Sequence, residues 1–203
     1  MNGHAVDNVI HIKTYPELPF NEEEALRYAG GGDDQVRQLL RDAWEEAADK
    51  LDYKICYRRY PMRQLNGEGG LDLGFAEVTS RHLARHLRDC DRIVVFAATL
   101  GLGLDRLISR YQQLSPAKAL MLQGIGAAQA EALCDQFCRD ISDSEGPCRP
   151  RFSPGFGDLG LGLQRDVFAA LDPERKIGIT LNGSLLMTPS KSVTAIIGIC
   201  RQL

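Results

Sequence analysis

The run RIVVFAAT at residues 92–99 constrains the fold of this chain more than any other feature. A strand with one exposed face alternates apolar and polar residues, whereas a strand covered on both faces is apolar almost throughout. Only the two ends of this run are polar. The run therefore predicts a central strand with other layers of the protein packed on both of its faces.

The remaining patterns mix helices and strands in uneven order. Asn21 precedes three glutamates and is typical of a helix start, because its side chain can cap the first turn and acids favour the positive end. Ser115-Pro116 indicates the start of a long helix rich in glycine and alanine, which a neighbour can approach closely. We expect helices at residues 22–29, 34–50, 79–88, 101–111, 116–141 and 164–171, and further strands at residues 6–13, 53–65, 71–75, 176–181 and 192–200.

This order predicts an α+β fold in which a mixed, mostly antiparallel sheet is flanked by helices. With 203 residues and no long linker, we expect a single domain over residues 1–203. A net charge of −3 argues against a nucleic-acid partner. No apolar run approaches the roughly 18 residues of a membrane span, and the first residues lack the pattern of a secretory signal. We therefore expect a cytoplasmic protein with no membrane partner.

Two short motifs fall short of known site signatures. Gly101 and Gly103 follow the apolar strand as in a dinucleotide-binding turn, but Arg106 stands where that fingerprint needs a third glycine. His82 and His86 are spaced to share one helical face, but the glutamate that a zincin carries between them is missing. Three neighbouring arginines would repel a metal cation. We interpret this helix as having a solvated basic face.

Six cysteines are spread along the chain without a repeated spacing: Cys56, Cys90, Cys134, Cys138, Cys148 and Cys200. A disulfide framework needs an oxidising compartment and is usual in smaller chains, so we interpret them as free thiols. No CxxC motif or Cys/His cluster supplies the four ligands of a zinc site, so we expect no metal.

Residues 142–162 hold five glycines and three prolines without regular periodicity. A loop of about 20 residues inside a compact domain is uncommon and is usually functional. Arg151 offers a planar guanidinium for a carboxylate, Gly155 allows close backbone approach, and Phe156 offers a ring face. Glu145 could hold an ammonium group or ribose hydroxyls. These residue types suit a zwitterionic small molecule with a flat or cationic part, with a packed structural loop as the alternative.

The pattern Arg151-x-x-x-Gly155-Phe156 resembles the Arg-x-x-x-Gly-Tyr signature of the S-adenosylmethionine-binding activation domain of cobalamin-dependent methionine synthase. Glu145 stands at the family's acidic position six residues before the arginine. Glu131 lies in AQAEALCD, which is similar to the family's Ala-Glu-Ala helix. RIVVFAATLG and LLMTPSKSVTAIIGI are similar to its central strand and its late motif.

This resemblance covers most of residues 90–200 and is weak over residues 1–89. It implies the activation-domain fold and a role in the reductive reactivation of a cobalamin methyltransferase, foremost methionine synthase, with S-adenosylmethionine as methyl donor. Cobalamin would be carried by a separate corrinoid-binding protein or methionine synthase core, and a flavodoxin-like or other donor would supply one electron. The chain lacks cobalamin, folate and homocysteine modules, so we expect a free-standing methyltransferase component of methionine biosynthesis.

The resemblance also implies which residues bind the ligand. Arg151 would take the methionine carboxylate, and the two glutamates would contact the ammonium group or ribose. Phenylalanine in place of the signature tyrosine leaves stacking but no phenolic hydrogen bond. No catalytic acid or base is implied, because methyl transfer from a sulfonium needs none. The implied site comprises Glu131, Glu145, Arg151, Phe152, Ser153, Pro154, Gly155 and Phe156.

Two alternatives remain open at this point. The chain could be a non-catalytic module that docks on a corrinoid protein without using S-adenosylmethionine. It could also activate a corrinoid methyltransferase other than methionine synthase.

Overall fold

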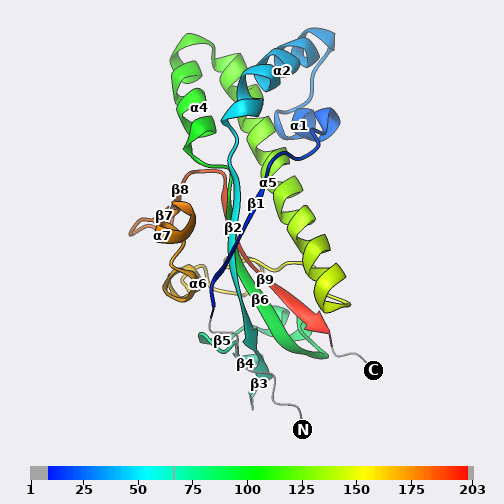
Figure 1. The fold of residues 1–203 in the computed structure, drawn as a ribbon, viewed down its shortest axis with the longest axis vertical. Helices are drawn as coiled ribbons and strands as arrows, with labels where there is room; N and C mark the ends of the chain where they lie inside the picture. Colours follow the sequence, from blue (N-terminus) through cyan, green and yellow to red (C-terminus); the bar gives the residue numbers. More distant parts are fainter. Residues whose placement is uncertain (1–8, 66, 201–203) are drawn as a thin grey trace.

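A four-stranded sheet forms the centre of the molecule in the computed structural model, which describes residues 9–65 and 67–200 (Figure 1). Its strand order is β1-β2-β6-β9, and each neighbouring pair is antiparallel. The strands are β1 (His11–Tyr15), β2 (Tyr53–Pro61), β6 (Cys90–Thr99) and β9 (Ser192–Cys200). The α+β class with flanking helices is confirmed, and the sheet is antiparallel throughout the strands described here.

Helices cover both faces of this sheet and extend beyond one end of it. These helices are α1 (Glu22–Tyr28), α2 (Asp34–Ala47), α4 (Leu102–Leu114), α5 (Pro116–Glu145), α6 (Leu163–Leu171) and α7 (Pro173–Ile177), with the 3-10 turn η1 (Ala48–Lys50) after α2. Figure 1 shows α1, α2 and α4 gathered around the first part of α5, while the rest of α5 follows one face of the sheet. Helices α6 and α7 lie on the other face.

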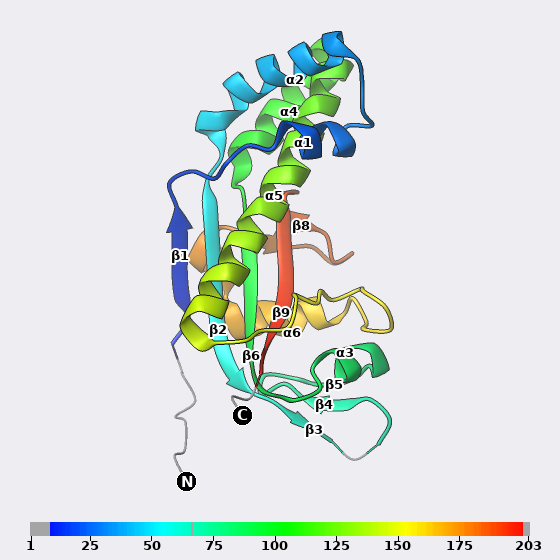
Figure 2. The same cartoon turned by 90° about the vertical axis from the view of Figure 1, so that its right-hand side faces the viewer.

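A smaller layer lies at the opposite end of the molecule (Figure 2). It combines a short antiparallel sheet with one helix: β3 (Arg63–Gln64), β4 (Gly70–Asp72), β5 (Glu77–Thr79) and α3 (Arg81–His86). The pair β7 (Thr180–Leu181) and β8 (Met187–Thr188) precedes β9. The side chain of Ser80 caps α3 by accepting a hydrogen bond from the Leu83 N–H.

Strand β6 is covered on both faces, as its sequence predicts. Val94 and Phe96 are fully buried in the core that the sheet shares with α5. Ile93 and Val95 are fully buried in the second core, which includes side chains of α6. Because burying one such side chain is worth about 1.5–3 kcal/mol, this strand contributes to both cores and holds the two layers together.

The small residues of α5 serve helix packing within the molecule. A Cβ atom at Gly124 would lie 2.5 Å from the Ala25 carbonyl oxygen of α1. A Cβ atom at Gly126 would lie 2.7 Å from Leu104 of α4 and 2.8 Å from Lys191. The close approach that the sequence predicts is therefore made by this chain's own elements.

Several predicted boundaries are wrong, and part of one predicted strand lies outside the described residues. The strand expected at residues 71–75 ends at Asp72, and a further strand, β5, occupies the start of the helix expected at residues 79–88. Helix α5 continues one turn beyond residue 141 to Glu145, so that residue belongs to the helix. The strand expected at residues 176–181 is mostly helical, because Pro173 begins α7 and only Thr180–Leu181 pair as a strand. Residues 6–8 of the first predicted strand lie outside the described part of the chain, and β1 begins at His11.

Candidate functional site

The segment that carries Arg151 is hydrogen-bonded to edge strand β9. After α5 the chain reverses, and the Arg149 N–H donates to the Gly198 carbonyl at 2.8 Å. The Phe152 N–H donates to the Ile196 carbonyl at 2.8 Å, and the Ile196 N–H donates back at 2.9 Å. These bonds hold the candidate ligand residues on a fixed part of the scaffold, as a binding site requires.

The guanidinium of Arg151 lies against two carboxylates of α5. Its Nη1 donates to Asp135 and its Nη2 donates to Glu131, which is one helical turn earlier. The exposed fraction is 21% for the Arg151 side chain, 39% for Glu131 and 55% for Asp135. We call these three residues the Arg151 cluster.

The acidic neighbours of Arg151 outnumber its own charge and raise its pKa. Burial acts to lower the pKa of Arg151, but the Asp135 hydrogen bond and the charges of nearby acidic groups outweigh it and raise that pKa. One guanidinium faces two carboxylates. A guanidinium has five N–H donors, so the two bonds to α5 leave others for a ligand.

A tight turn places Phe156 beside the cluster's segment. The Phe156 N–H donates to the Ser153 carbonyl at 3.1 Å, and the backbone of Gly155 has a φ of +88°, which favours glycine. Pro154 is buried, whereas the Phe156 side chain is 66% exposed. Its ring and the buried Phe152 ring pack in a T-shaped arrangement, with 5.2 Å between their centroids. The turn therefore presents one aromatic face to solvent.

Asp158 anchors this turn to α3. Its carboxylate accepts hydrogen bonds from the Ser80 hydroxyl and from the backbone N–H groups of Arg81, at 2.8 Å, and His82, at 3.2 Å. These bonds lower the pKa of Asp158. The turn is thus fixed at both ends.

The structure does not bring Glu145 to Arg151. Glu145 lies fourteen residues after Glu131 on α5, which is about 21 Å along a helix. Its side chain is 14% exposed and accepts hydrogen bonds from Arg59 Nε at 2.6 Å and from Arg92 Nη1 at 2.8 Å. Burial acts to raise the pKa of Glu145, but the two guanidiniums outweigh it and lower that pKa. We call these three residues the Glu145 clamp.

Sequence reasoning missed Asp135. Its signal was present, because Asp135 follows Glu131 by four residues and therefore shares its helical face. The cluster that the structure assembles has three charged side chains and a neighbouring turn. It can bind a carboxylate at Arg151 and an ammonium or other cation at the two acids.

The described residues supply neither a metal site nor a membrane-spanning helix. Within residues 9–65 and 67–200, no group of three or more His, Cys, Asp or Glu side chains is arranged to hold a metal ion. Over the same residues, every helix is too short or too polar to cross a membrane. The six cysteines are free thiols, and burial raises the pKa of Cys134 to about 12.

Comparisons with known proteins identify the fold. Searches with the sequence match no protein-family model and no curated protein. The structure is similar to the crystal structure of the MetH reactivation domain bound to AdoHcy, with a TM-score of 0.67 and 14% sequence identity. The alignment covers 94% of this chain and 78% of that chain. The chain therefore has the fold of the MetH reactivation domain, as the sequence resemblance implies.

Proposed function

We propose that this chain binds S-adenosylmethionine at the Arg151 cluster and supports reductive reactivation of a cobalamin-dependent methyltransferase, foremost methionine synthase. The observation that carries the proposal is the cluster itself: Arg151 meets Glu131 and Asp135 of α5, on the segment that leads into the turn with the exposed Phe156. The fold likeness supports it, because the similar domain was crystallised with AdoHcy.

The residues of the cluster match the groups of S-adenosylmethionine. The Arg151 guanidinium can donate two parallel hydrogen bonds to the methionine carboxylate. Glu131 and Asp135 can attract the ammonium group and the sulfonium. The ligand has a net charge of +1 and the cluster has an excess of one carboxylate, so the charges are complementary. Phe156 offers a face for the adenine ring or the sulfonium.

In this proposal the chain positions reactants and performs no proton transfer. S-adenosylmethionine supplies the methyl group that restores methylcobalamin. Arg151 and its two acids fix the ligand's amino-acid end, while the backbone of residues 152–155 lines the adenosine. Cobalamin is held by a separate corrinoid-binding protein or methionine synthase core. The one electron comes from a flavodoxin-like or other donor.

Calorimetry tests the binding step. We expect S-adenosylmethionine to bind more tightly than S-adenosylhomocysteine, because only the former has the sulfonium charge that the two acids attract. Reversal of this order would remove the charge argument. Absence of heat with both ligands, with the fold shown intact, would refute the proposed binding.

Reconstitution tests the reactivation step. The protein is mixed with S-adenosylmethionine, a one-electron donor and cob(II)alamin, either free or on a candidate corrinoid protein, and the corrinoid spectrum is followed. Methylcobalamin formed only with the carrier supports the proposal. Equal rates with free cobalamin would contradict it. Binding of the carrier without S-adenosylmethionine or turnover would favour a docking module.

A further inference from the structure

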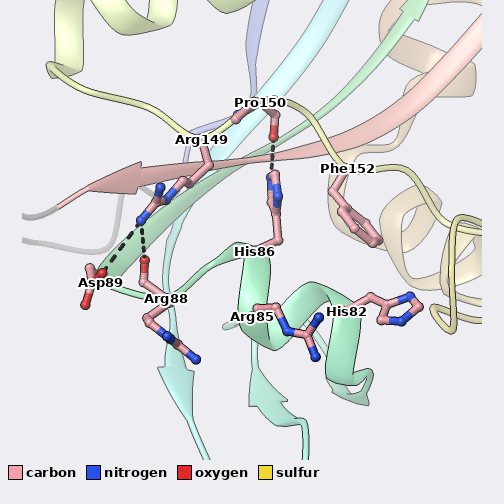
Figure 3. Close-up of a pocket in the computed structure, with 8 residues that line it drawn as sticks. All are labelled: His82, Arg85, His86, Arg88, Asp89, Arg149, Pro150 and Phe152. Carbon is pink, nitrogen blue, oxygen red and sulfur yellow. Dashed lines mark hydrogen bonds and ion pairs between the residues drawn. The ribbon is translucent and has the colours of Figure 1, made fainter.

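A concave surface lies beside the segment that carries Arg151. It is a cleft of about 680 Å³ between α3 and residues 149–152 (Figure 3). This volume falls within the roughly 300–1,000 Å³ that is typical of small-molecule sites. Arg149 and Phe152 line it, whereas Arg151 pairs with α5. One segment therefore contributes to two different sites.

Two arginines of this cleft are without counter-charges. Among the described residues, the guanidiniums of Arg85 and Arg88 have no ion pair or hydrogen-bond partner. The nearby Arg63, Arg81 and Arg149 each pair with a carboxylate. Unpaired guanidiniums in a concave surface are available to an incoming anion.

The balance of charge in the cleft is positive although the chain as a whole is negative. Three guanidiniums line the cleft and Asp89 is the one carboxylate among its described lining residues. The Asp89 carboxylate lies 3.6 Å from Arg149 Nη2. The whole chain has a net charge of −3, so the positive charge is a local property of this surface.

The cleft is formed before any ligand binds, because α3 and the facing segment are bonded to each other. Arg149 Nη2 donates to the Arg88 carbonyl at 3.1 Å, and His86 Nε2 donates to the Pro150 carbonyl at 2.6 Å. The His86 and Phe152 rings are 5.3 Å apart. Figure 3 shows the Arg88 side chain extending away from the carbonyl that Arg149 contacts, which leaves its guanidinium free.

We propose that this cleft binds a small ligand with two or more phosphate or carboxylate groups, and that Arg85 and Arg88 are its principal contacts. Guanidiniums match both kinds of oxyanion through paired N–H donors. The charges meet in one concavity, whereas an extended polyanion such as a nucleic acid needs a basic stripe. The proposal does not depend on binding of S-adenosylmethionine.

Calorimetry at low salt with tripolyphosphate and with citrate tests the site and distinguishes phosphate from carboxylate. We expect Arg85→Gln/Arg88→Gln to weaken binding of the preferred anion at least tenfold. The control Arg106→Gln/Arg175→Gln removes the same charge from α4 and α7, outside the cleft, and we expect less than a twofold change. Equal weakening by both double variants would overturn the proposal, because binding would then follow overall charge.

A variant that binds the anion more tightly complements the loss-of-binding variant, because misfolding cannot explain a gain of affinity. We expect Asp89→Asn to bind the anion severalfold more tightly, because it removes the cleft's carboxylate and asparagine tolerates the positive φ of this position. Arg151→Lys should leave the affinity for tripolyphosphate unchanged, which separates this site from the Arg151 cluster. No binding of either anion, or binding of polyglutamate alone, would refute a small-anion site.

Discussion

Helix α5 carries two arginine–carboxylate clusters with opposite composition. In the Arg151 cluster one guanidinium faces two carboxylates, and Asp135 is 55% exposed. In the Glu145 clamp one carboxylate faces two guanidiniums, and Glu145 is 14% exposed. The same functional groups therefore form an exposed cluster with surplus negative charge around Arg151 and a largely buried ionic contact around Glu145.

The two clusters differ in how deeply their charged groups are buried and in how many of their hydrogen-bond partners the protein itself supplies. The clamp joins the end of α5 to β2 and β6, and its carboxylate has its hydrogen-bond partners within the protein. The Arg151 cluster keeps spare donors and exposed carboxylates, which a ligand can use. We therefore expect changes in the clamp to lower stability and changes in the cluster to lower affinity.

The largest expected effect is on stability. Glu145→Gln removes the carboxylate that bridges the half-buried guanidiniums of Arg59 and Arg92, and we expect the free energy of unfolding to fall by about 3 kcal/mol. Urea denaturation measures this change. The control Glu24→Gln breaks the exposed pair with Arg27 and should cost less than about 0.5 kcal/mol. Affinity for S-adenosylmethionine should stay near wild type, and a tenfold loss would return Glu145 to the ligand site.

The second-largest expected effect is on the affinity for S-adenosylmethionine. Arg151→Lys replaces a two-pronged donor by a point charge, so we expect S-adenosylmethionine to bind about 2 kcal/mol more weakly. Arg149→Lys, on the same segment, is the matched control and should keep wild-type affinity. Calorimetry compares the two variants. Unchanged affinity in Arg151→Lys would remove this residue from the site.

A smaller loss is expected at Phe156. Truncation in Phe156→Ala removes the exposed ring and should weaken S-adenosylmethionine binding by about 1 kcal/mol. Phe156→Tyr should be neutral or slightly favourable. Because the ring is 66% exposed, thermal denaturation should show little change in either variant. Equal affinity of the wild type and Phe156→Ala would dismiss stacking.

The smallest expected effect is on the pH dependence of the free energy of unfolding. The folded protein lowers the pKa of Glu145, so this group stabilises the fold above its ordinary pKa of 4.5 and loses that contribution as pH falls through the folded value. The stability difference between wild type and Glu145→Gln should therefore shrink below pH 4.5. The slope should stay under about 1.4 kcal/mol per pH unit, the limit for one proton. Urea denaturation over a pH series measures it, and a constant difference would rule out an ionic clamp.

Local patterns in the sequence predicted most of the helices and strands, because they depend on neighbouring residues. Strand β6 follows from its unbroken apolar run, and α1 begins at the Asn21 cap as predicted. The error at residues 176–181 arose because a short apolar stretch does not distinguish a strand from a single helical turn.

The candidate site was predictable only in part. Arg151, Gly155 and Phe156 are close in sequence, so the turn that joins them is local. Glu145 is also close to Arg151 in sequence, but one extra helical turn directs it toward Arg59 and Arg92, which are 86 and 53 residues away. Such long-range pairs depend on the tertiary fold. The cleft beside α3 forms for the same reason.

The hydrogen bonds between residues 147–152 and β9 also have a consequence for solubility. β9 is the outer strand of the main sheet, and a bare outer strand offers unpaired backbone groups to other chains. Here the Cys200 N–H donates to the Pro147 carbonyl at 2.9 Å, and the bonds at Arg149 and Phe152 continue along the strand. The segment that carries Arg151 thus also shields the sheet from intermolecular strand pairing, so a variant that detaches it should aggregate as well as lose the proposed site.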